Sequence, residues 1–419
     1  MRSCYATFVS LLFLSLCATA ADPQSAKLSS PPPAGSSWVQ EATLTNTLGC
    51  CDNGLAVAIN GNTVAVSPGG SFVAVYVKPA GGWHSMTQIA TLTPSNPATA
   101  FNFGSSIAIA GNTIVVGCDQ ATVGGNAVQE TLYVFVEPVG GWTNMTETAI
   151  LTASDGAAND SLGLSVGIDG NTIIAGAPVH KPSGAAYIFV KPAGGWATGT
   201  QTAELTGSTA SGASGVGGRV AISGGTVAAT AGVGSFPGQG GALVYVKPSS
   251  GWANTTENAV LDTGVLTVSS VFSLAISGDT VVGGAPFISP NGVSHAGAVF
   301  VWVRPAAGWS KSMPPTAELT ASTGTGNANL GEGVGINASV IVAGAPGTTV
   351  GSNLKQGAVY VFNKPASGWK NATESAELLL AGATPADLFG FSVGLSGGTL
   401  VGAAPFINST TGAAYIFGQ

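Results

Sequence analysis

Charged residues are scarce in this chain. Asp, Glu, Lys and Arg together make up 7% of its 419 residues, and the net charge is −7. Amphipathic surface helices need a polar, usually charged face, so this composition excludes a mainly helical fold. A basic surface that could neutralise phosphates is missing as well, which excludes nucleic acid as a partner.

Long apolar runs are also missing. A membrane-spanning helix needs about 20 apolar residues, and the run FVSLLFLSLC at residues 8–17 is about half that length. It follows Arg2 and precedes Ala18-Thr19-Ala20, a pattern typical of secretory signal peptides. We therefore expect residues 1–20 to be a signal peptide cleaved near Ala20. The mature chain is then secreted or held at the cell surface, with no transmembrane segment.

Cysteine and histidine are few. Two of the five cysteines belong to the predicted signal peptide, and the mature chain keeps Cys50, Cys51 and Cys118. An odd number in an exported protein fits one disulfide with one thiol left over, or three buried thiols. The three histidines are His84, His180 and His295. They form no HExxH or other metal-ligand spacing, so we expect no metal ion and no cofactor.

Small and apolar residues are plentiful instead. The chain has 62 Gly and 23 Pro, and 45% of it is hydrophobic. Disorder requires low hydrophobicity with high net charge, so the composition predicts a folded chain. Many short strands joined by Gly- and Pro-rich turns fit it best.

A tryptophan motif repeats along the chain at intervals of 45 to 60 residues. It reads KPAGGW or a variant of it, and its tryptophans are Trp38, Trp83, Trp142, Trp196, Trp252, Trp309 and Trp369. A short apolar run such as ATLT or AELT follows each of them. Three further strand-like runs fill each interval, as in LGLSVGI (162–168), NTIIAG (171–176) and AYIFV (186–190). Gly-rich joints between the first two runs supply the positive φ that a tight hairpin needs.

Seven repeats of four strands predict an all-β, seven-bladed β-propeller with four-stranded antiparallel blades over residues 38–419. Residues 21–37 are a Pro/Ser-rich linker before it. The first repeat has one strand to spare and the last lacks one. We therefore expect residues 39–45 to pair beside residues 413–419, which closes the ring and removes two sheet edges.

Recurring dipeptides and tripeptides add a family resemblance. FG occurs at 103–104 and 389–390, and GAP at 176–178, 284–286 and 344–346. In this order and register they resemble the FG-GAP repeats of integrin α-subunit propellers and of many exported bacterial proteins. The resemblance covers about residues 38–419 and implies a seven-bladed propeller, in agreement with the strand count.

The chain departs from that family at its calcium loops. Integrin-type propellers carry Asp-x-Asp-x-Asp loops between the first two strands of several blades. The joints here read AGN (110–112), DGN (169–171), SGG (223–225) and SGD (277–279). Calcium needs six to eight oxygen ligands, which such short turns with at most one carboxylate cannot supply. The family's calcium sites are therefore not expected.

One face of the predicted disc carries loops that differ strongly between repeats. Loops on a rigid scaffold commonly hold binding residues, although neutral drift also produces such variation. The polar candidates in these loops are Asp119, Glu130, Asp155, Asp160, His180, Lys181, His295 and Lys355. Solvated surface side chains are the alternative interpretation for each of them.

Two covalent features are also expected. Cys51 (or Cys50) and Cys118 fall on the variable face of adjacent predicted blades, so a disulfide between them is plausible. It would stabilise the fold by about 4 kcal/mol in the chain-entropy model. Six glycosylation sequons are present, at Asn144, Asn159, Asn254, Asn337, Asn371 and Asn408. Their number is near chance in a chain so rich in Ser and Thr.

Three functions remain open. The first is an exported, monomeric binding or adhesion module that recognises a protein or a glycan through the loop face. The second is an extracellular glycan hydrolase or lyase with carboxylates at the channel mouth. The third is a purely structural surface or matrix component. No catalytic motif is present, and we favour the first, which is not an enzyme.

Overall fold

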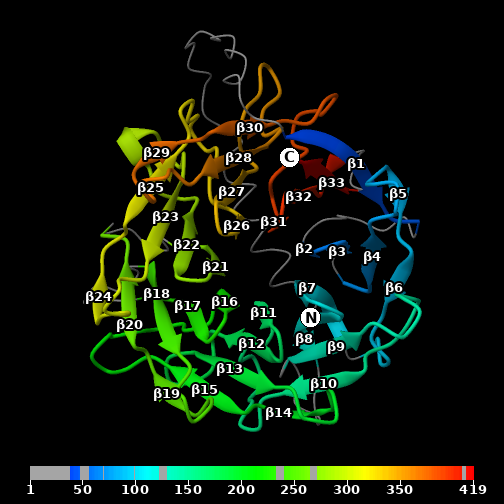
Figure 1. Ribbon diagram of the computed structural model, residues 1–419, viewed down its shortest axis with the longest axis vertical. Helices are drawn as coiled ribbons and strands as arrows, with labels where there is room; N and C mark the ends of the chain where they lie inside the picture. Colours follow the sequence, from blue (N-terminus) through cyan, green and yellow to red (C-terminus); the bar gives the residue numbers. More distant parts are fainter. Residues whose placement is uncertain are drawn as a thin grey trace. The chain divides into compact units, whose positions relative to one another are not determined.

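The computed structural model describes residues 38–47, 56–68, 70–98, 100–121, 130–232, 240–264, 271–407 and 412–419. The predicted signal peptide and linker (1–37), Cys50, Cys51 and Asn408 lie outside these residues. The described residues of the 38–419 segment form seven sheets arranged in a ring (Figure 1). The predicted seven-bladed β-propeller is confirmed.

Each blade is an antiparallel meander of four strands, ordered from the centre of the ring outwards. Blades 1 to 4 are β2(Ala56–Asn60)-β3(Thr63–Ser67)-β4(Val73–Val77)-β6(Ala90–Leu92), β7(Ala100–Ala110)-β8(Thr113–Ala121)-β9(Thr131–Val136)-β10(Ala149–Thr152), β11(Val166–Asp169)-β12(Thr172–Ala177)-β13(Ala185–Val190)-β15(Ala203–Thr206) and β16(Val220–Ser223)-β17(Thr226–Gly232)-β18(Gly240–Val246)-β20(Ala259–Asp262). Blades 5 to 7 are β21(Ser273–Ser277)-β22(Thr280–Ala285)-β23(Ala298–Val303)-β25(Ala317–Thr320), β26(Val334–Ile336)-β27(Val340–Ala345)-β28(Ala358–Asn363)-β30(Ala376–Leu378) and β31(Val393–Ser396)-β32(Thr399–Ala404)-β33(Ala413–Gly418)-β1(Val39–Thr45). The innermost strands contact one another around the centre of Figure 1.

The first strand of the chain closes the last blade. β1 pairs antiparallel with β33, and the register places Val39 opposite Gly418 and Leu44 opposite Ala414, with one bulge. Trp38 and Phe417 lie in the same buried cluster. The predicted ring closure is therefore confirmed.

A fifth, two-residue strand extends five of the seven sheets, which the expectation of four strands per blade missed. These strands are β5(Met86–Thr87), β14(Gly199–Thr200), β19(Thr255–Thr256), β24(Ser312–Met313) and β29(Ala372–Thr373). Each follows the tryptophan of one repeat and pairs parallel with the outermost strand of the preceding blade. Two residues carry no detectable strand pattern, so only the tertiary structure shows this link between blades.

Side chains reinforce the same link. The residue two positions after the tryptophan accepts a backbone N–H from the preceding blade, as Asn254 Oδ1 does from Glu204 N at 2.9 Å. Three positions further on, Glu257 accepts both the N–H and the hydroxyl of Ser208. Asn144 and Asn371 repeat the first contact, and Glu147 and Glu374 repeat the second. The polar residues of the tryptophan turns therefore join neighbouring blades.

Seven buried clusters fill the seven interfaces between adjacent blades. Each contains one tryptophan of the repeat, and six of these are at least nine-tenths buried, with Trp309 partly buried. A blade therefore packs apolar side chains on both faces, which explains an apolar sequence with little alternation to charge.

The GAP glycines lie where neighbouring blades approach most closely. A Cβ on Gly176 would lie 1.8 Å from the carbonyl oxygen of Gly217, which occupies the FG glycine position of the next blade. Gly344 faces Gly390 in the same way, also at 1.8 Å. Gly217 has a φ of +98°, a conformation that glycine adopts without strain. The two motifs are therefore two sides of one backbone contact.

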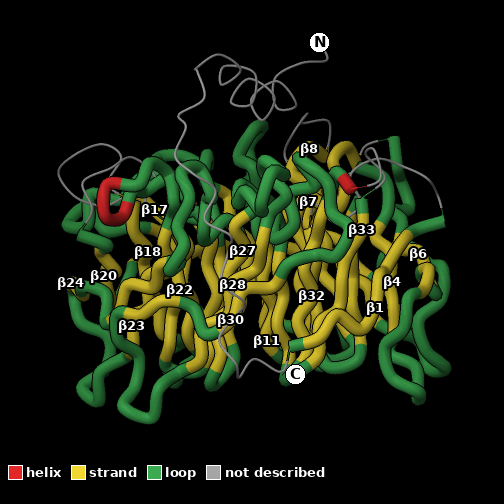
Figure 2. Tube along the Cα trace, turned by 90° about the horizontal axis from the view of Figure 1, so that it is seen from above, coloured by secondary structure: helices red, strands yellow, loops and turns green. Residues whose placement is uncertain are grey.

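The two faces of the disc differ as predicted. Loops from the second to the third strand, and from the outermost strand to the next blade, share one face, which we call the loop face; it lies uppermost in Figure 2. The short helix η1 (Pro290–Gly292) lies in one of these loops, between β22 and β23. The tryptophan turns and the end of β33 lie on the opposite side, which we call the turn face.

Candidate functional site

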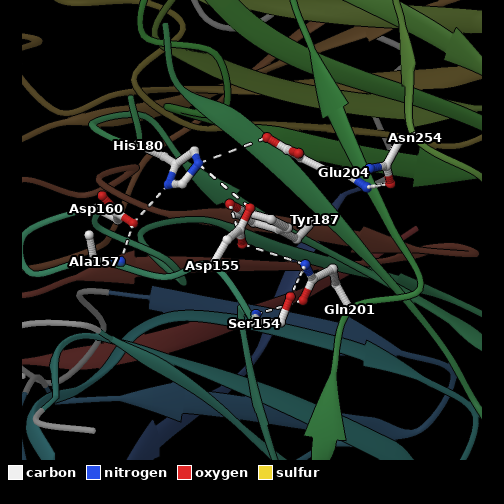
Figure 3. Close-up of polar contacts among 9 residues, drawn as sticks. All are labelled: Ser154, Asp155, Ala157, Asp160, His180, Tyr187, Gln201, Glu204 and Asn254. Atoms are coloured by element: carbon white, nitrogen blue, oxygen red, sulfur yellow. Dashed lines mark hydrogen bonds and ion pairs between the residues drawn. The ribbon is translucent and has the colours of Figure 1, made fainter. Parts of the chain in front are cut away.

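Three of the eight predicted binding residues come together on the loop face of blade 3. Asp155 and Asp160 lie in the segment that crosses from β10 of blade 2 to β11 of blade 3, and His180 lies in the β12–β13 loop. Glu204 on β15 and Tyr187 on β13 complete the group, which we call the blade 3 cluster (Figure 3). It lies at the edge of the buried interface between blades 2 and 3, where Tyr187 packs.

The backbone holds His180 firmly in place. His180 N donates to Ala177 O at 3.2 Å, and Gly184 N donates to His180 O at 2.6 Å, so the loop forms a closed turn. Val179 N donates to Asp160 O at 3.2 Å and ties this loop to the crossing segment. The imidazole is 13% exposed and lies edge-on to the Tyr187 ring at 5.8 Å between centroids. Its position is therefore set by packing and by the backbone.

Asp160 orients the imidazole. Its side chain is 8% exposed, and its Oδ2 lies 2.8 Å from His180 Nδ1. The same oxygen accepts the Ala157 backbone N–H at 2.7 Å. A carboxylate at this distance favours a proton on Nδ1, which leaves Nε2 as the second functional atom of the ring.

Two further carboxylates face Nε2. Asp155 Oδ2 lies 3.8 Å away and Glu204 Oε1 lies 3.9 Å away (Figure 3). The Asp155 side chain is 44% exposed and the Glu204 side chain 22%, so the group opens to solvent on one side. Burial raises the pKa of Glu204, the nearby Asp155 charge raises it further, and His180 opposes the shift.

Tyr187 hydrogen-bonds only one of these two carboxylates, that of Asp155. Its hydroxyl donates to Asp155 Oδ1 at 3.2 Å, although Glu204 lies directly opposite Tyr187 in the sheet. In blade 6 the equivalent pair behaves differently, because Tyr360 donates to its opposite residue Glu377 at 3.0 Å. In blade 3 the Glu204 carboxylate is instead directed toward His180.

The other candidates do not join this cluster. Lys181 and His295 are exposed, the second on the β22–β23 loop, and Lys355 is half-buried on the β27–β28 loop. Glu130 is fully buried, and its Oε2 accepts the Leu162 N–H at 3.1 Å, which joins blade 2 to blade 3. Asp119 lies in β8, and its side chain is outside the described residues.

The hairpin joints form hydrogen bonds from blade to blade. Asn60 accepts the N–H of Gly111 at 3.1 Å, and Ser223 accepts that of Gly278 at 3.1 Å. Asp169, the carboxylate of the DGN joint, likewise accepts the N–H of Gly224. These are the places where integrin-type repeats hold calcium, and here their side chains bond the next joint.

The structure describes only some of the residues of the predicted disulfide and glycosylation sites. Cys118 is buried on β8, while Cys50 and Cys51 lie outside the described residues, so the disulfide stays a prediction. Among the sequons, Asn144, Asn159, Asn254 and Asn371 are exposed. Asn337 is half-buried, and its Nδ2 donates to Gly397 O at 2.9 Å. Glycosylation stays a prediction at each of them.

Glu332 is another carboxylate whose pKa is raised by burial. It precedes the innermost strand of blade 6, and burial raises its pKa from 4.5 to about 7, although Arg219 opposes the shift. Arg219 precedes the innermost strand of blade 4 and stacks over the Phe272 ring at 4.8 Å. Glu332 therefore takes up a proton on folding near neutral pH.

This shift predicts a pH-dependent stability. Between pH 4.5 and 7 the folded chain binds more protons at Glu332 than the unfolded chain does, so stability falls as the pH rises through this range. We expect Glu332→Gln to remove this loss, which amounts to about 2 kcal/mol. Unfolding of both proteins from pH 5 to pH 8 measures it. Parallel stability curves for the two would contradict the prediction.

Comparison with known proteins agrees with the repeat. The family model described as the FG-GAP repeat matches three segments, residues 86–135, 145–189 and 315–362. The chain carries FG-GAP repeats. Each matched segment begins after a repeat tryptophan and ends in the third strand of the following blade. Together with the seven sheets, this is consistent with an FG-GAP propeller like that of integrin α-subunits.

Further comparisons concern the fold alone. The crystal structure of the computationally designed Ika8 protein is similar, with a TM-score of 0.51 and 13% sequence identity. The alignment covers 91% of this chain and 100% of that one. No curated protein matches the sequence. Within the described residues, no helix has the length and apolar character that crossing a membrane requires.

Proposed function

We propose that this FG-GAP propeller is an extracellular binding module, and not an enzyme, whose ligand is a protein or a glycan bound on the loop face. The fold supports a role in interaction, because rigid blades hold many loops on a common surface. The composition of the tryptophan turns is nearly constant between repeats, whereas the loop-face segments vary in length and chemistry.

Exposed apolar side chains on this face carry the proposal. Val179, Leu354 and Phe406 come from the loop-face segments of blades 3, 6 and 7, and they are 51%, 66% and 36% exposed. Apolar side chains held by a rigid scaffold can serve as anchors of a binding site. The predicted signal peptide and the resemblance to integrin-type propellers support an extracellular setting.

The hydrolase alternative receives less support. Paired carboxyl groups of glycosidases lie roughly 5–10 Å apart in an enclosed cleft. The ligand atoms of Asp155, His180 and Glu204 lie within 4.8 Å of one another, and Asp155 is largely open to solvent. They belong to the outer part of blade 3 rather than to the channel mouth.

A matched pair of triple variants tests the proposal. Residues 21–419 are probed against a glycan array and a panel of extracellular proteins. Val179→Ser, Leu354→Ser and Phe406→Ser combined should weaken binding to any ligand found at least tenfold, because anchor residues contribute more than about 1 kcal/mol each.

The control changes three apolar residues that are exposed elsewhere, at Ile89, Val139 and Val190. Serine at these positions should leave both binding and folding unchanged, because exposed substitutions alter stability by about 0.5 kcal/mol or less. Loss of binding in the control variant alone would show that the binding site lies outside the loop face. Failure of the wild type to bind any component would favour the structural role instead.

A further inference from the structure

We propose that Asp155, His180 and Glu204 bind a divalent transition-metal ion of the zinc class, with Asp160 orienting His180. Val179 precedes His180 in the same loop, but the metal site is tested through its own ligand side chains, so either proposal can fail alone. One nitrogen atom and two carboxylate oxygens of the three ligands lie within 4.8 Å of one another. Imidazole with two carboxylates is a ligand set that zinc accepts, with a water molecule in the fourth position.

The spacing around Nε2 points to an ion between these atoms. The distances of 3.8 Å to Asp155 and 3.9 Å to Glu204 exceed those of hydrogen bonds. Ligands held at 2.0–2.2 Å from a tetrahedral metal are about 3.3 Å apart. The two carboxylates would therefore have to move toward Nε2 and toward each other to complete the coordination, because the three ligand atoms now lie within 4.8 Å of one another.

Asp160 provides the arrangement found behind metal-bound histidines. Its carboxylate lies 2.8 Å from Nδ1 and is itself held by a backbone N–H. A histidine that ligates a metal commonly donates its other ring N–H to such a carboxylate, which fixes the ring and strengthens the ligand. The lone pair of Nε2 is then directed toward two further carboxylates.

The local charge also favours a bound cation. The blade 3 cluster contains the three carboxylates of Asp155, Asp160 and Glu204, and no Lys or Arg among the described residues forms an ion pair with them. Bound divalent cations supply the dominant positive charge in sites of this kind. The imidazole selects zinc or a similar metal over calcium, which prefers oxygen ligands alone.

Comparison with Asp387 in blade 7 distinguishes the structural role of Asp160 from its proposed role at the metal. Asp387 there accepts the N–H and hydroxyl of Thr384, three residues earlier, just as Asp160 accepts the N–H of Ala157. The blade 7 loop FINSTTG has no histidine. A carboxylate at this position therefore serves the turn in both blades, and only blade 3 adds the histidine contact.

Zinc titration of residues 21–419 after removal of bound metal tests the proposal. We expect one zinc ion per chain at this site, with calcium unable to displace it. His180→Gln, Asp155→Asn and Glu204→Gln should each weaken zinc binding at least tenfold, and Asp160→Asn by roughly 10- to 100-fold. Asp155→Asn should disturb the fold least, because Asp155 has the most exposed side chain of the three proposed ligands.

Matched controls come from blade 5. His295→Gln changes a histidine in the equivalent loop, and Glu318→Gln changes the residue at the Glu204 position of β25. Both should bind zinc as the wild type does. Cobalt in place of zinc should show no sulfur charge-transfer band, which distinguishes this site from one formed by cysteines.

Three results would overturn the proposal. They are zinc binding that the ligand variants leave unchanged, calcium binding in preference to zinc, and no zinc binding at all. Thermal unfolding of each metal-free variant confirms that it has folded before binding is compared.

Discussion

Removing residues 21–45 should destabilise the propeller more than any other terminal change. The deletion removes β1, which supplies the outermost antiparallel strand of blade 7 and pairs with β33. The deletion also removes the buried side chains of Trp38, Ala42 and Leu44. Truncating one buried Leu costs about 2–5 kcal/mol and one Trp about 3–5 kcal/mol. Their combined loss approaches the whole stability of a typical domain, about 5–15 kcal/mol.

Thermal unfolding and refolding yield measure this effect. The reference is a chain that begins at residue 21, and the matched control lacks only residues 21–36 and so keeps Trp38 and β1. The control should unfold at the same temperature as the reference. The longer deletion should unfold at a much lower temperature, or aggregate through the exposed edge of β33. Leu44→Ala, with an expected loss of about 2–5 kcal/mol, tests the same contact without a new edge. Equal unfolding temperatures for the two deletions would show that closure contributes little.

Gly176→Ala should be one of the most damaging single substitutions in the FG-GAP motif. The added Cβ would lie 1.8 Å from Gly217 O and 2.7 Å from Gly217 C, both backbone atoms. Gly176 cannot move away easily, because its N–H donates to Ser165 O and its carbonyl accepts from Gly163 N. We expect a loss of at least about 3 kcal/mol, the upper part of the range for overpacking.

Gly194→Ala is the control for this prediction. Gly194 lies in the tryptophan turn of blade 3, has no positive φ, and would place its Cβ more than 4 Å from other atoms. Its substitution should change stability by about 0.5 kcal/mol or less. Gly344→Ala repeats the Gly176 contact in blade 6, against Gly390, and should reproduce the loss. A Gly176→Ala protein as stable as the control would show that the blades separate at little cost.

Much of the fold could be predicted because the sequence pattern of a blade recurs seven times along the chain. The tryptophan turns mark the blades, the Gly-rich joints mark the inner hairpins, and the unmatched ends predict that residues 39–45 join residues 413–419. The two-residue strands that follow five of the seven tryptophans could not be predicted. Their pairing partner lies in another blade, and so short a segment has no hydrophobic period of its own.

The residues of the blade 3 cluster could also be predicted only in part. Sequence analysis selected Asp155, Asp160 and His180 because they lie in variable loops. It missed Glu204, because the same AELT segment places Glu318 in blade 5, and nothing in the local sequence distinguishes the two. It predicted no metal ion, because the three histidines form no metal-ligand spacing, and the zinc titration decides between that prediction and the proposed site.

The sequence by itself determined the number of blades, their strand order, the closure of the ring and the face that carries variable loops. These follow from local turn chemistry and from a repeated apolar pattern, which depend only on neighbours along the chain. Only the tertiary structure decided which GAP glycine meets which FG glycine, and that Asp155, His180 and Glu204 surround one point. Such contacts join residues from different strands and blades, so their distances depend on how the blades pack rather than on how the sequence is spaced.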